Sequence, residues 1–256
     1  MEFINSNKLK RNLDEYKKQW SEKTPFRYLV IDDFLLPEKA ELVLKNYPAV
    51  DHGEWDGTTY INQKNKFQQR DFAPESVFAK IFKELNSAEF LKDAEYITGI
   101  EKLIADEKLF GGGLHQSING AFLDVHVDYN IHPETKLHRR LNILVYMNKD
   151  WQDEYEGHLQ LWDMQRKEMI SNIAPLFNRM VMFETNEISF HGHPKPLKTP
   201  QGITRKSLAA YYYTDTRPTN EIAKEHNTIY VNTQGVQGKA KNLFSGLKAL
   251  VERFFG

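Results

Sequence analysis

The spacing of apolar residues divides the chain into two parts. Up to about residue 110, apolar positions recur at intervals of three and four among Lys, Arg and Glu, which places them on one face of an α-helix. This pattern predicts helices over 4–20, 36–46, 74–85 and 88–98, and one short strand over 28–31. The stretch 51–71 is polar and aromatic without a regular period, so it predicts a loop, either a solvated connection or a lid over a site.

The pattern changes after Gly111-Gly112-Gly113. Short apolar runs now alternate with turn residues, and no helical pattern lies between them. The runs predict strands over 114–118, 122–127, 141–147, 158–162, 180–183, 208–213 and 228–231. Short strands at such spacing favour a sandwich or barrel over a parallel sheet with crossover helices. We expect a mainly β fold with flanking helices (α+β), in which N-terminal helices pack on a double-stranded β-helix, the cupin-like jelly roll.

A single domain accounts for this length and composition. Within it, residues 1–110 form a helical support with a candidate substrate loop at 51–71, residues 111–217 form the jelly-roll core, and residues 218–256 form an extension. The extension carries an apolar stripe over 240–254 among lysines and arginines, which predicts an amphipathic helix. Such a stripe more often packs on its own domain or on a twin subunit than on a membrane surface, so a homodimer is a candidate assembly.

Charge and cysteine content exclude several classes of function. The 34 Lys and Arg residues balance 35 Asp and Glu residues, so no overall field attracts nucleic acid or an anionic membrane. The chain has no cysteine, which excludes disulfides, thiolate nucleophiles and zinc–thiolate sites. Apolar runs are too short for a membrane span or a signal segment. We therefore expect a cytoplasmic protein without stable membrane insertion.

The candidate chemistry centres on His126-Val127-Asp128. Residues i and i+2 of a strand project to the same face, so His126 and Asp128 can hold one metal ion from one side. A second histidine, His191, follows a later apolar strand. Two imidazoles and one carboxylate that leave the opposite face of the metal open are the ligand set of non-heme Fe(II) oxygenases. A zinc-type hydrolase using the same three residues, or a non-catalytic jelly-roll binding module, is the alternative.

Several motifs in series carry a resemblance to a known family. After His126-Val-Asp128 come His138-Arg-Arg-Leu-Asn-Ile-Leu-Val-Tyr146, Gly157-His-Leu-Gln-Leu, Asn178-Arg179-Met-Val-Met-Phe183, Phe190-His191-Gly and Thr204-Arg205-Lys-Ser-Leu. In this order, over about residues 112–217, they resemble the prolyl 4-hydroxylase-like Fe(II)- and 2-oxoglutarate-dependent dioxygenases.

The resemblance implies a role for individual residues. His126, Asp128 and His191 would be the iron ligands, with His193 as the competitor of His191 that we expect in the following turn. Arg205 would hold the distal carboxylate of 2-oxoglutarate, because a guanidinium fits a carboxylate with two hydrogen bonds. Further cosubstrate contacts are assigned to Tyr146, and to His115 and Gln116, which stand where many relatives have a tyrosine.

The resemblance also implies a reaction. Fe(II), 2-oxoglutarate and O2 would serve to hydroxylate an unactivated C–H bond with release of succinate and CO2, and ascorbate is a candidate reductant. The substrate would be a prolyl residue of a protein or peptide, or a small molecule, because loops determine specificity on a shared fold.

Overall fold

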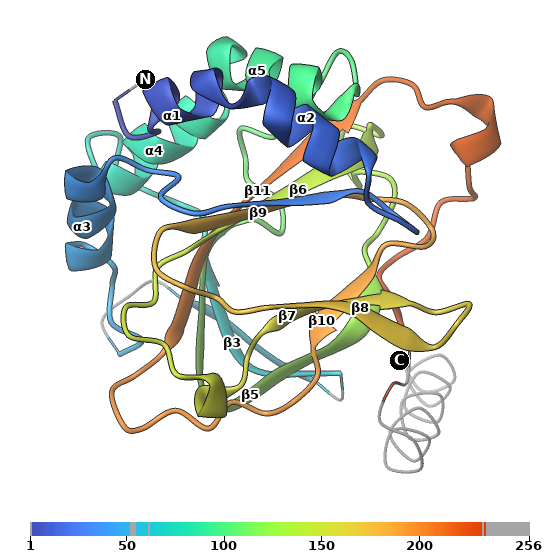
Figure 1. Ribbon diagram of the computed structural model, residues 1–256. Coiled ribbons are helices and arrows are strands. Elements are labelled where there is room, and N and C mark those ends of the chain that lie inside the picture. Colours follow the sequence, from blue (N-terminus) through green and yellow to red (C-terminus); the bar gives the residue numbers. More distant parts are fainter. Residues whose placement is uncertain (1, 52–54, 61, 232, 234–256) are drawn as a thin grey trace.

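The computed structural model describes residues 2–51, 55–60, 62–231 and 233. Helices gather at the N-terminal end of the chain and strands follow. Figure 1 shows two curved layers of strands, with the helices packed on the outer face of one layer. The predicted C-terminal helix over 240–254 lies outside the described residues. None of the helices in the described part has the length and apolar character needed to cross a membrane.

The N-terminal helices begin and end where local side chains satisfy the backbone. They are α1 (Ser6–Arg11), α2 (Leu13–Ser21), α3 (Pro37–Lys45), α4 (Val77–Leu85) and α5 (Ala88–Thr98). The hydroxyl of Ser76 accepts a hydrogen bond from the Ala79 amide, and Ser87 caps α5 in the same way, as is typical at helix N-termini. The single helix predicted over 4–20 is wrong in one respect, because it is interrupted at Asn12, whose side-chain amide donates to the Lys8 carbonyl.

The strands form two layers joined by β5 (Gly113–Val127). Beneath the helices lie β1 (Tyr28–Ile31), β9 (Arg179–Glu184), β6 (His138–Tyr146) and β11 (Arg205–Thr214), paired in that order. The opposite layer contains β10 (Phe190–His193), β7 (Leu159–Asp163) and β8 (Glu168–Ile173). The order β1-β9-β6-β11-β5-β10-β7-β8 is antiparallel throughout. This arrangement confirms the predicted jelly-roll core with N-terminal helices packed against it.

Strand β5 belongs to both layers. Its first part pairs with β11, with Ser117 opposite Arg205, and its last part pairs with β10, with His126 opposite His191. Gly120 lies between the two parts with a φ of 76°, a left-handed conformation that glycine adopts without strain. The two strands predicted over 114–118 and 122–127 are thus one continuous strand. It passes from the layer beneath the helices into the opposite layer.

The predicted loop over 51–71 is wrong for most of its length. It forms a hairpin of β2 (Asp56–Tyr60) and β3 (Gln63–Gln69), and β3 pairs with the edge of β5. Strand propensity is low for Gln, Lys and Asn, so the hairpin depends on the hydrogen bonds that β5 offers. Two-residue strands β4 (Ile104–Ala105) and β12 (Ile229–Tyr230) also pair with the core, β12 beside His126 and Val127. Short 3₁₀ turns lie at Asp153–Tyr155 and Thr219–Glu221.

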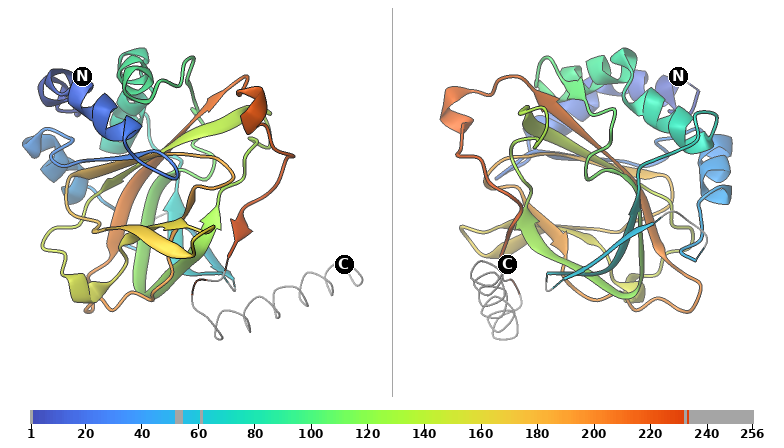
Figure 2. Two further views of the ribbon diagram at one scale, coloured as in Figure 1. Left: turned by 45° about the vertical axis from the view of Figure 1, so that its right-hand side comes forward. Right: turned by 180° about the vertical axis from the view of Figure 1, so that it is seen from behind.

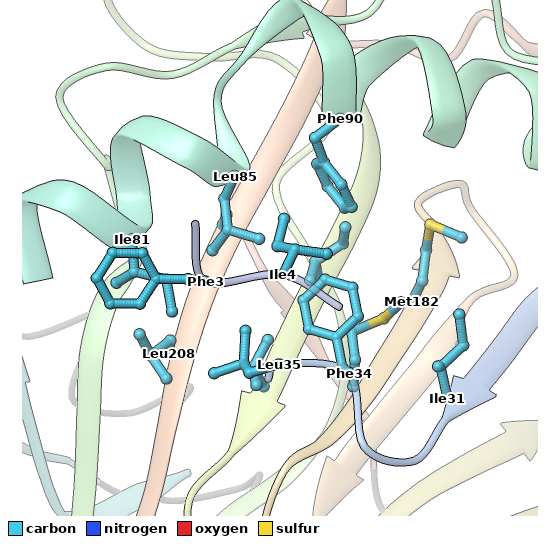
Figure 3. Packing of buried hydrophobic residues seen from close by; sticks show 14 of the residues in the cluster. Phe3, Ile4, Ile31, Phe34, Leu35, Ile81, Leu85, Phe90, Met182 and Leu208 are labelled. Carbon is cyan, nitrogen blue, oxygen red and sulfur yellow. The ribbon is translucent and has the colours of Figure 1, made fainter. Parts of the chain in front are cut away.

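A large apolar core lies between the helices and the sheet of β9, β6 and β11. Figure 3 shows Ile81, Leu85 and Phe90 of the helices facing Met182 and Leu208 of the strands. Figure 2 shows the helices on one side only, leaving the layer of β7, β8 and β10 without a helical cover among the described residues. A smaller apolar cluster, which includes Leu161 of β7 and Phe183 of β9, lies between the two strand layers. The polar side chains of the candidate site lie beside it.

Candidate metal and cosubstrate site

The structure brings His126, Asp128 and His191 together. Each offers one ligand atom, and these atoms lie within 4.8 Å of one another. The Nε2 atoms of His126 and His191 lie 3.6 and 3.5 Å from the two Asp128 carboxylate oxygens. Register explains the meeting, since His191 of β10 stands directly opposite His126 of β5. The three side chains offer one ion the ligands that the sequence analysis assigned to it.

Hydrogen bonds fix the orientation of both imidazoles. The Nδ1 of His126 lies 2.8 Å from the Asp124 carbonyl, and the Nδ1 of His191 lies 2.9 Å from the Ser189 carbonyl. A carbonyl oxygen can only accept, so each Nδ1 carries a hydrogen and each Nε2 presents its lone pair. Both lone pairs are directed to the space beside Asp128. This donor set therefore fits a divalent metal ion.

Arg139 and Asn142 of β6 hold the carboxylate. Arg139 lies 3.2 Å from Asp128 Oδ2, and the Asn142 amide donates to the same oxygen at 2.7 Å. The Arg139 Nε in turn donates to the Asn142 carbonyl oxygen at 2.9 Å. The guanidinium is 3.7 Å from the ring centroid of Tyr211 and 4.5 Å from that of Tyr129. One oxygen of Asp128 is thus occupied by protein donors, which leaves the other for a metal.

Charges in the buried site set its protonation. Burial alone would raise the pKa of Asp128, but the charge of Arg139 and the two histidines hold it well below its usual range. Burial, together with the neighbouring His126, lowers the pKa of His191 to about 4. At neutral pH the site therefore contains an ionised carboxylate and a neutral His191, the protonation states in which both bind metal.

Arg205 lines the same hollow, and its guanidinium contacts the Tyr146 hydroxyl. This hollow of about 90 Å³ is lined by all three candidate ligands and by Arg205. Arg205 donates from Nε to the Gly157 carbonyl at 2.7 Å and from a terminal nitrogen to the Tyr146 hydroxyl at 3.2 Å. Arg205 is the first residue of β11, and Tyr146 is the last of the adjacent β6. The guanidinium is held in one orientation beside a phenol, as a carboxylate-binding group requires.

His115 and Gln116, which the sequence analysis also assigned to the cosubstrate, face opposite sides of β5. His115 lines the hollow, with its Nε2 3.0 Å from the Gly111 carbonyl, and burial lowers its pKa well below the usual range. Gln116 does not line it, because adjacent strand residues face opposite sides. Its amide instead donates to the Thr204 hydroxyl at 2.7 Å.

The expected position of His193 is wrong. It lies in β10 rather than in a following turn, and only 6% of it is exposed. Its side chain lines the same hollow as Arg205, and its Nδ1 has no hydrogen-bond partner within the described part of the chain. The preference for His191 over His193 as the ligand agrees with the geometry, because His191 is the one that lies within reach of Asp128.

Sequence reasoning missed Lys66, Asn142 and Ser207. All three line the hollow. Burial lowers the pKa of Lys66 to about 8, with Asp128 opposing the shift and Arg205 and Arg139 adding to it. Asn142 and Leu144 are two residues apart on β6, so strand alternation places both on the face that lines the hollow. That alternation could have identified Asn142 from the sequence. Lys66 gave no such signal, because its strand depends on pairing with β5.

The core of the chain is similar in sequence to known oxygenases. Residues 112–213 match the family model of the 2OG-Fe(II) oxygenase superfamily. A segment of 79 residues, 29% of this chain, is 28% identical to mouse (Mus musculus) prolyl 3-hydroxylase OGFOD1. That segment spans 14% of the length of the mouse protein. The family match covers the strands from β5 to β11, which hold the candidate ligands and Arg205.

Solved structures share the fold. A Pseudomonas putida prolyl-4-hydroxylase is 16% identical with a TM-score of 0.55, covering 78% of this chain and 98% of its own. A Trichoplax adhaerens prolyl hydroxylase, solved with a hypoxia inducible factor peptide fragment, is 15% identical with a TM-score of 0.56, covering 81% of this chain and 91% of its own. HygX of Streptomyces hygroscopicus, solved with nickel, 2-oxoglutarate and hygromycin B, is 13% identical with a TM-score of 0.52, covering 82% of this chain and 97% of its own. At these identities the likenesses show a common fold.

Proposed function

We propose that the chain is an Fe(II)- and 2-oxoglutarate-dependent hydroxylase. The proposal is supported by the match of residues 112–213 to the 2OG-Fe(II) oxygenase superfamily model and by the geometry of the site. The observation that carries the proposal is one hollow with two ends. His126, Asp128 and His191 converge at one end, and Arg205 with the Tyr146 hydroxyl stands at the other. A dicarboxylate needs both ends, whereas a metal hydrolase or a simple binding module needs no buried guanidinium opposite its metal.

Bound Fe(II) would supply the oxidation, in which O2 and 2-oxoglutarate give succinate and CO2 and one oxygen atom enters a C–H bond of the substrate. The chain's own residues would bind and orient. The two Nε2 atoms and Asp128 would hold the metal, and Arg139 with Asn142 would keep the carboxylate in place. Arg205 and Tyr146 would bind the distal carboxylate of the cosubstrate. The buried walls would exclude water from the reacting atoms.

The proposed substrate is a peptide or a small molecule. Among proteins of the same fold, one was solved with a peptide fragment and another with hygromycin B, so both classes enter sites of this architecture. Hydroxylation, ascorbate use, a cytoplasmic location and a homodimer stay predictions for this chain.

Anaerobic titration of the protein with Fe(II) and then 2-oxoglutarate tests the proposal. We expect a weak visible charge-transfer band that needs both components and is absent in Asp128→Ala and His191→Ala. His158→Ala, which changes a histidine outside the hollow, is the matched control and should keep the band. On admission of air, succinate should form with wild type and His158→Ala but not with Asp128→Ala or His191→Ala. A properly folded, metal-loaded wild type that shows no band would refute the proposal, and binding of the metal without any effect of 2-oxoglutarate would favour the hydrolase.

A further inference from the structure

Lys66 stands where two hollows meet. The inner hollow of about 90 Å³ reaches Arg205, and an outer hollow of about 220 Å³ lies on the other side of the candidate metal ligands. Both are lined by Lys66, His126 and Asp128. Lys66 projects from β3, on the same face of that strand as Gln68, which also lines the outer hollow. Its side chain therefore lies beside the candidate metal ligands His126 and Asp128 and lines both hollows.

The ammonium group of Lys66 has no partner within the part of the chain that the structure describes. Among the described residues, no hydrogen bond or ion pair involves its Nζ, although the side chain is half-buried. Surface lysines of this chain do find acids. Lys136 and Lys149 lie 3.0 and 2.6 Å from glutamate oxygens. A partly desolvated cation without a counter-charge from the protein gains from an anionic ligand that supplies one.

The charges that line the two hollows also favour an anionic ligand, because cationic side chains outnumber acidic ones. Their linings contain three residues with cationic side chains, Lys66, Arg139 and Arg205, and one acid, Asp128. A bound divalent metal would add two positive charges, and the dianion of 2-oxoglutarate would offset only those two. Asp128 is already paired with Arg139 at 3.2 Å, and Arg205 is assigned to the cosubstrate. The cation left without an assigned anion is Lys66.

The outer hollow is otherwise polar and neutral. Its lining includes Gln63, Gln68 and the tyrosines Tyr129, Tyr211 and Tyr230. Amides and phenols orient a polar ligand and select it by hydrogen bonds. They offer little to a wholly apolar one, whose burial would leave these groups without partners.

We propose that Lys66 binds a carboxylate of the substrate, so that the hydroxylated C–H bond belongs to a molecule with an anionic group close by. This inference rests on the proposed function and narrows it. A free amino acid or another small carboxylic acid meets the requirement. A prolyl residue inside a peptide, flanked by neutral residues, does not.

The test uses acetate as the probe and acetamide as its neutral counterpart. The protein is loaded with Mn(II) and saturated with 2-oxoglutarate, and the relaxation of the probe's methyl protons by the metal reports binding beside it at constant ionic strength. We expect acetate to bind wild type about tenfold or more tightly than Lys66→Met, the effect of one charge-assisted hydrogen bond. Lys66→Arg should retain most of the binding, and acetamide should not distinguish the variants.

Lys64→Met is the matched control, because Lys64 lies on the same strand but is exposed. It should bind acetate like wild type. Equal acetate binding by wild type and Lys66→Met would overturn the proposal. So would a weakening of 2-oxoglutarate binding in Lys66→Met as large as in Arg205→Met, since the carboxylate bound would then be that of the cosubstrate. Circular dichroism establishes that each variant folds, and Lys66→Gln provides the uncharged comparison if Lys66→Met does not fold.

Turnover provides a second arm. Succinate release is measured with pairs that differ only in charge, such as L-proline and L-prolinamide, and any stimulation should favour the carboxylate member in wild type and lose that preference in Lys66→Met. Stimulation by carboxamides alone would count against the proposal. The two levels of inference fail separately. Absence of 2-oxoglutarate binding to metal-loaded wild type refutes the proposed function, whereas the acetate comparison still measures what Lys66 binds.

Discussion

Replacing Arg139 by methionine tests how the site holds its carboxylate. Arg139 is 2% exposed, lies 3.2 Å from Asp128 and is stacked between Tyr211 and Tyr129. Methionine keeps the apolar stem but removes the guanidinium, so the losses are the charge, the stacking on both rings and the bond to Asn142. In the metal-free protein, Asp128 would then be buried without a cation, apart from the amide of Asn142.

The expected loss follows from that geometry. Removing one partner of a buried ion pair costs about 3–5 kcal/mol of unfolding free energy, because the remaining charge is left uncompensated. A bound divalent metal would supply that compensation. With metal present, the difference between wild type and Arg139→Met should shrink to about 2 kcal/mol or less, the part carried by ring stacking and by the bond to Asn142.

Urea denaturation with and without saturating Mn(II) measures both differences by linear extrapolation. Arg166→Met is the control, because the Arg166 side chain is 75% exposed, and its effect should stay within about 0.5 kcal/mol in both conditions. Two results would refute the reasoning. One is a loss below about 1 kcal/mol in the metal-free variant, and the other is a loss of the same size with and without metal.

Three further predictions concern other parts of the molecule. Because burial lowers the pKa of His191 to about 4, the unfolded chain takes up a proton that the folded chain excludes as pH falls below about 6.5. Metal-free stability should therefore drop by about 3 kcal/mol between pH 6.5 and 4, and urea titrations of His191→Gln should show a shallower slope. Arg205→Met should weaken 2-oxoglutarate binding about 10- to 100-fold in anaerobic titrations while metal affinity stays unchanged; an equal loss of both would contradict its role. Gly113→Ala should lose about 2 kcal/mol or more in urea, because a Cβ there would meet the Gln69 carbonyl oxygen at 2.3 Å, whereas Gly202→Ala, with a similar φ and nothing within 4 Å, should lose about 1 kcal/mol.

The part of the site that sequence could predict is the part fixed by strand periodicity. His126 and Asp128 are two residues apart at the end of an apolar strand, so alternation alone places both on one face. The same rule separates His115 from Gln116, and it shows why the structure brings His115 to the hollow and turns Gln116 toward Thr204. Applied to Phe190-His191-Gly192-His193, alternation would also have placed His193 on the interior face.

The part that sequence could not predict depends on pairing between distant segments. The hairpin of β2 and β3 is polar, and its second strand forms because β5 has a free edge. No local pattern in Gln63–Gln69 reports that edge, so the position of Lys66 beside Asp128 could not be derived. The break of the N-terminal helix at Asn12 has a local origin instead, the bond from the Asn12 side chain to the Lys8 carbonyl. Both flanking helices keep the apolar spacing that predicted one helix.

Lys66 and Arg139, the two cations that line the outer hollow with Asp128, also show that residue type alone does not assign a role. Arg139 donates to Asp128 and Asn142 and is stacked between two rings, so its charge is used by the protein itself. Lys66 has no such contact among the described residues, although it lines the same outer hollow as Arg139 and Asp128. A cation whose bonding capacity is filled stabilises the site, and one whose capacity is unfilled is free to recognise a ligand. On this criterion Arg139 positions the metal-binding carboxylate, and Lys66 selects what reaches the metal.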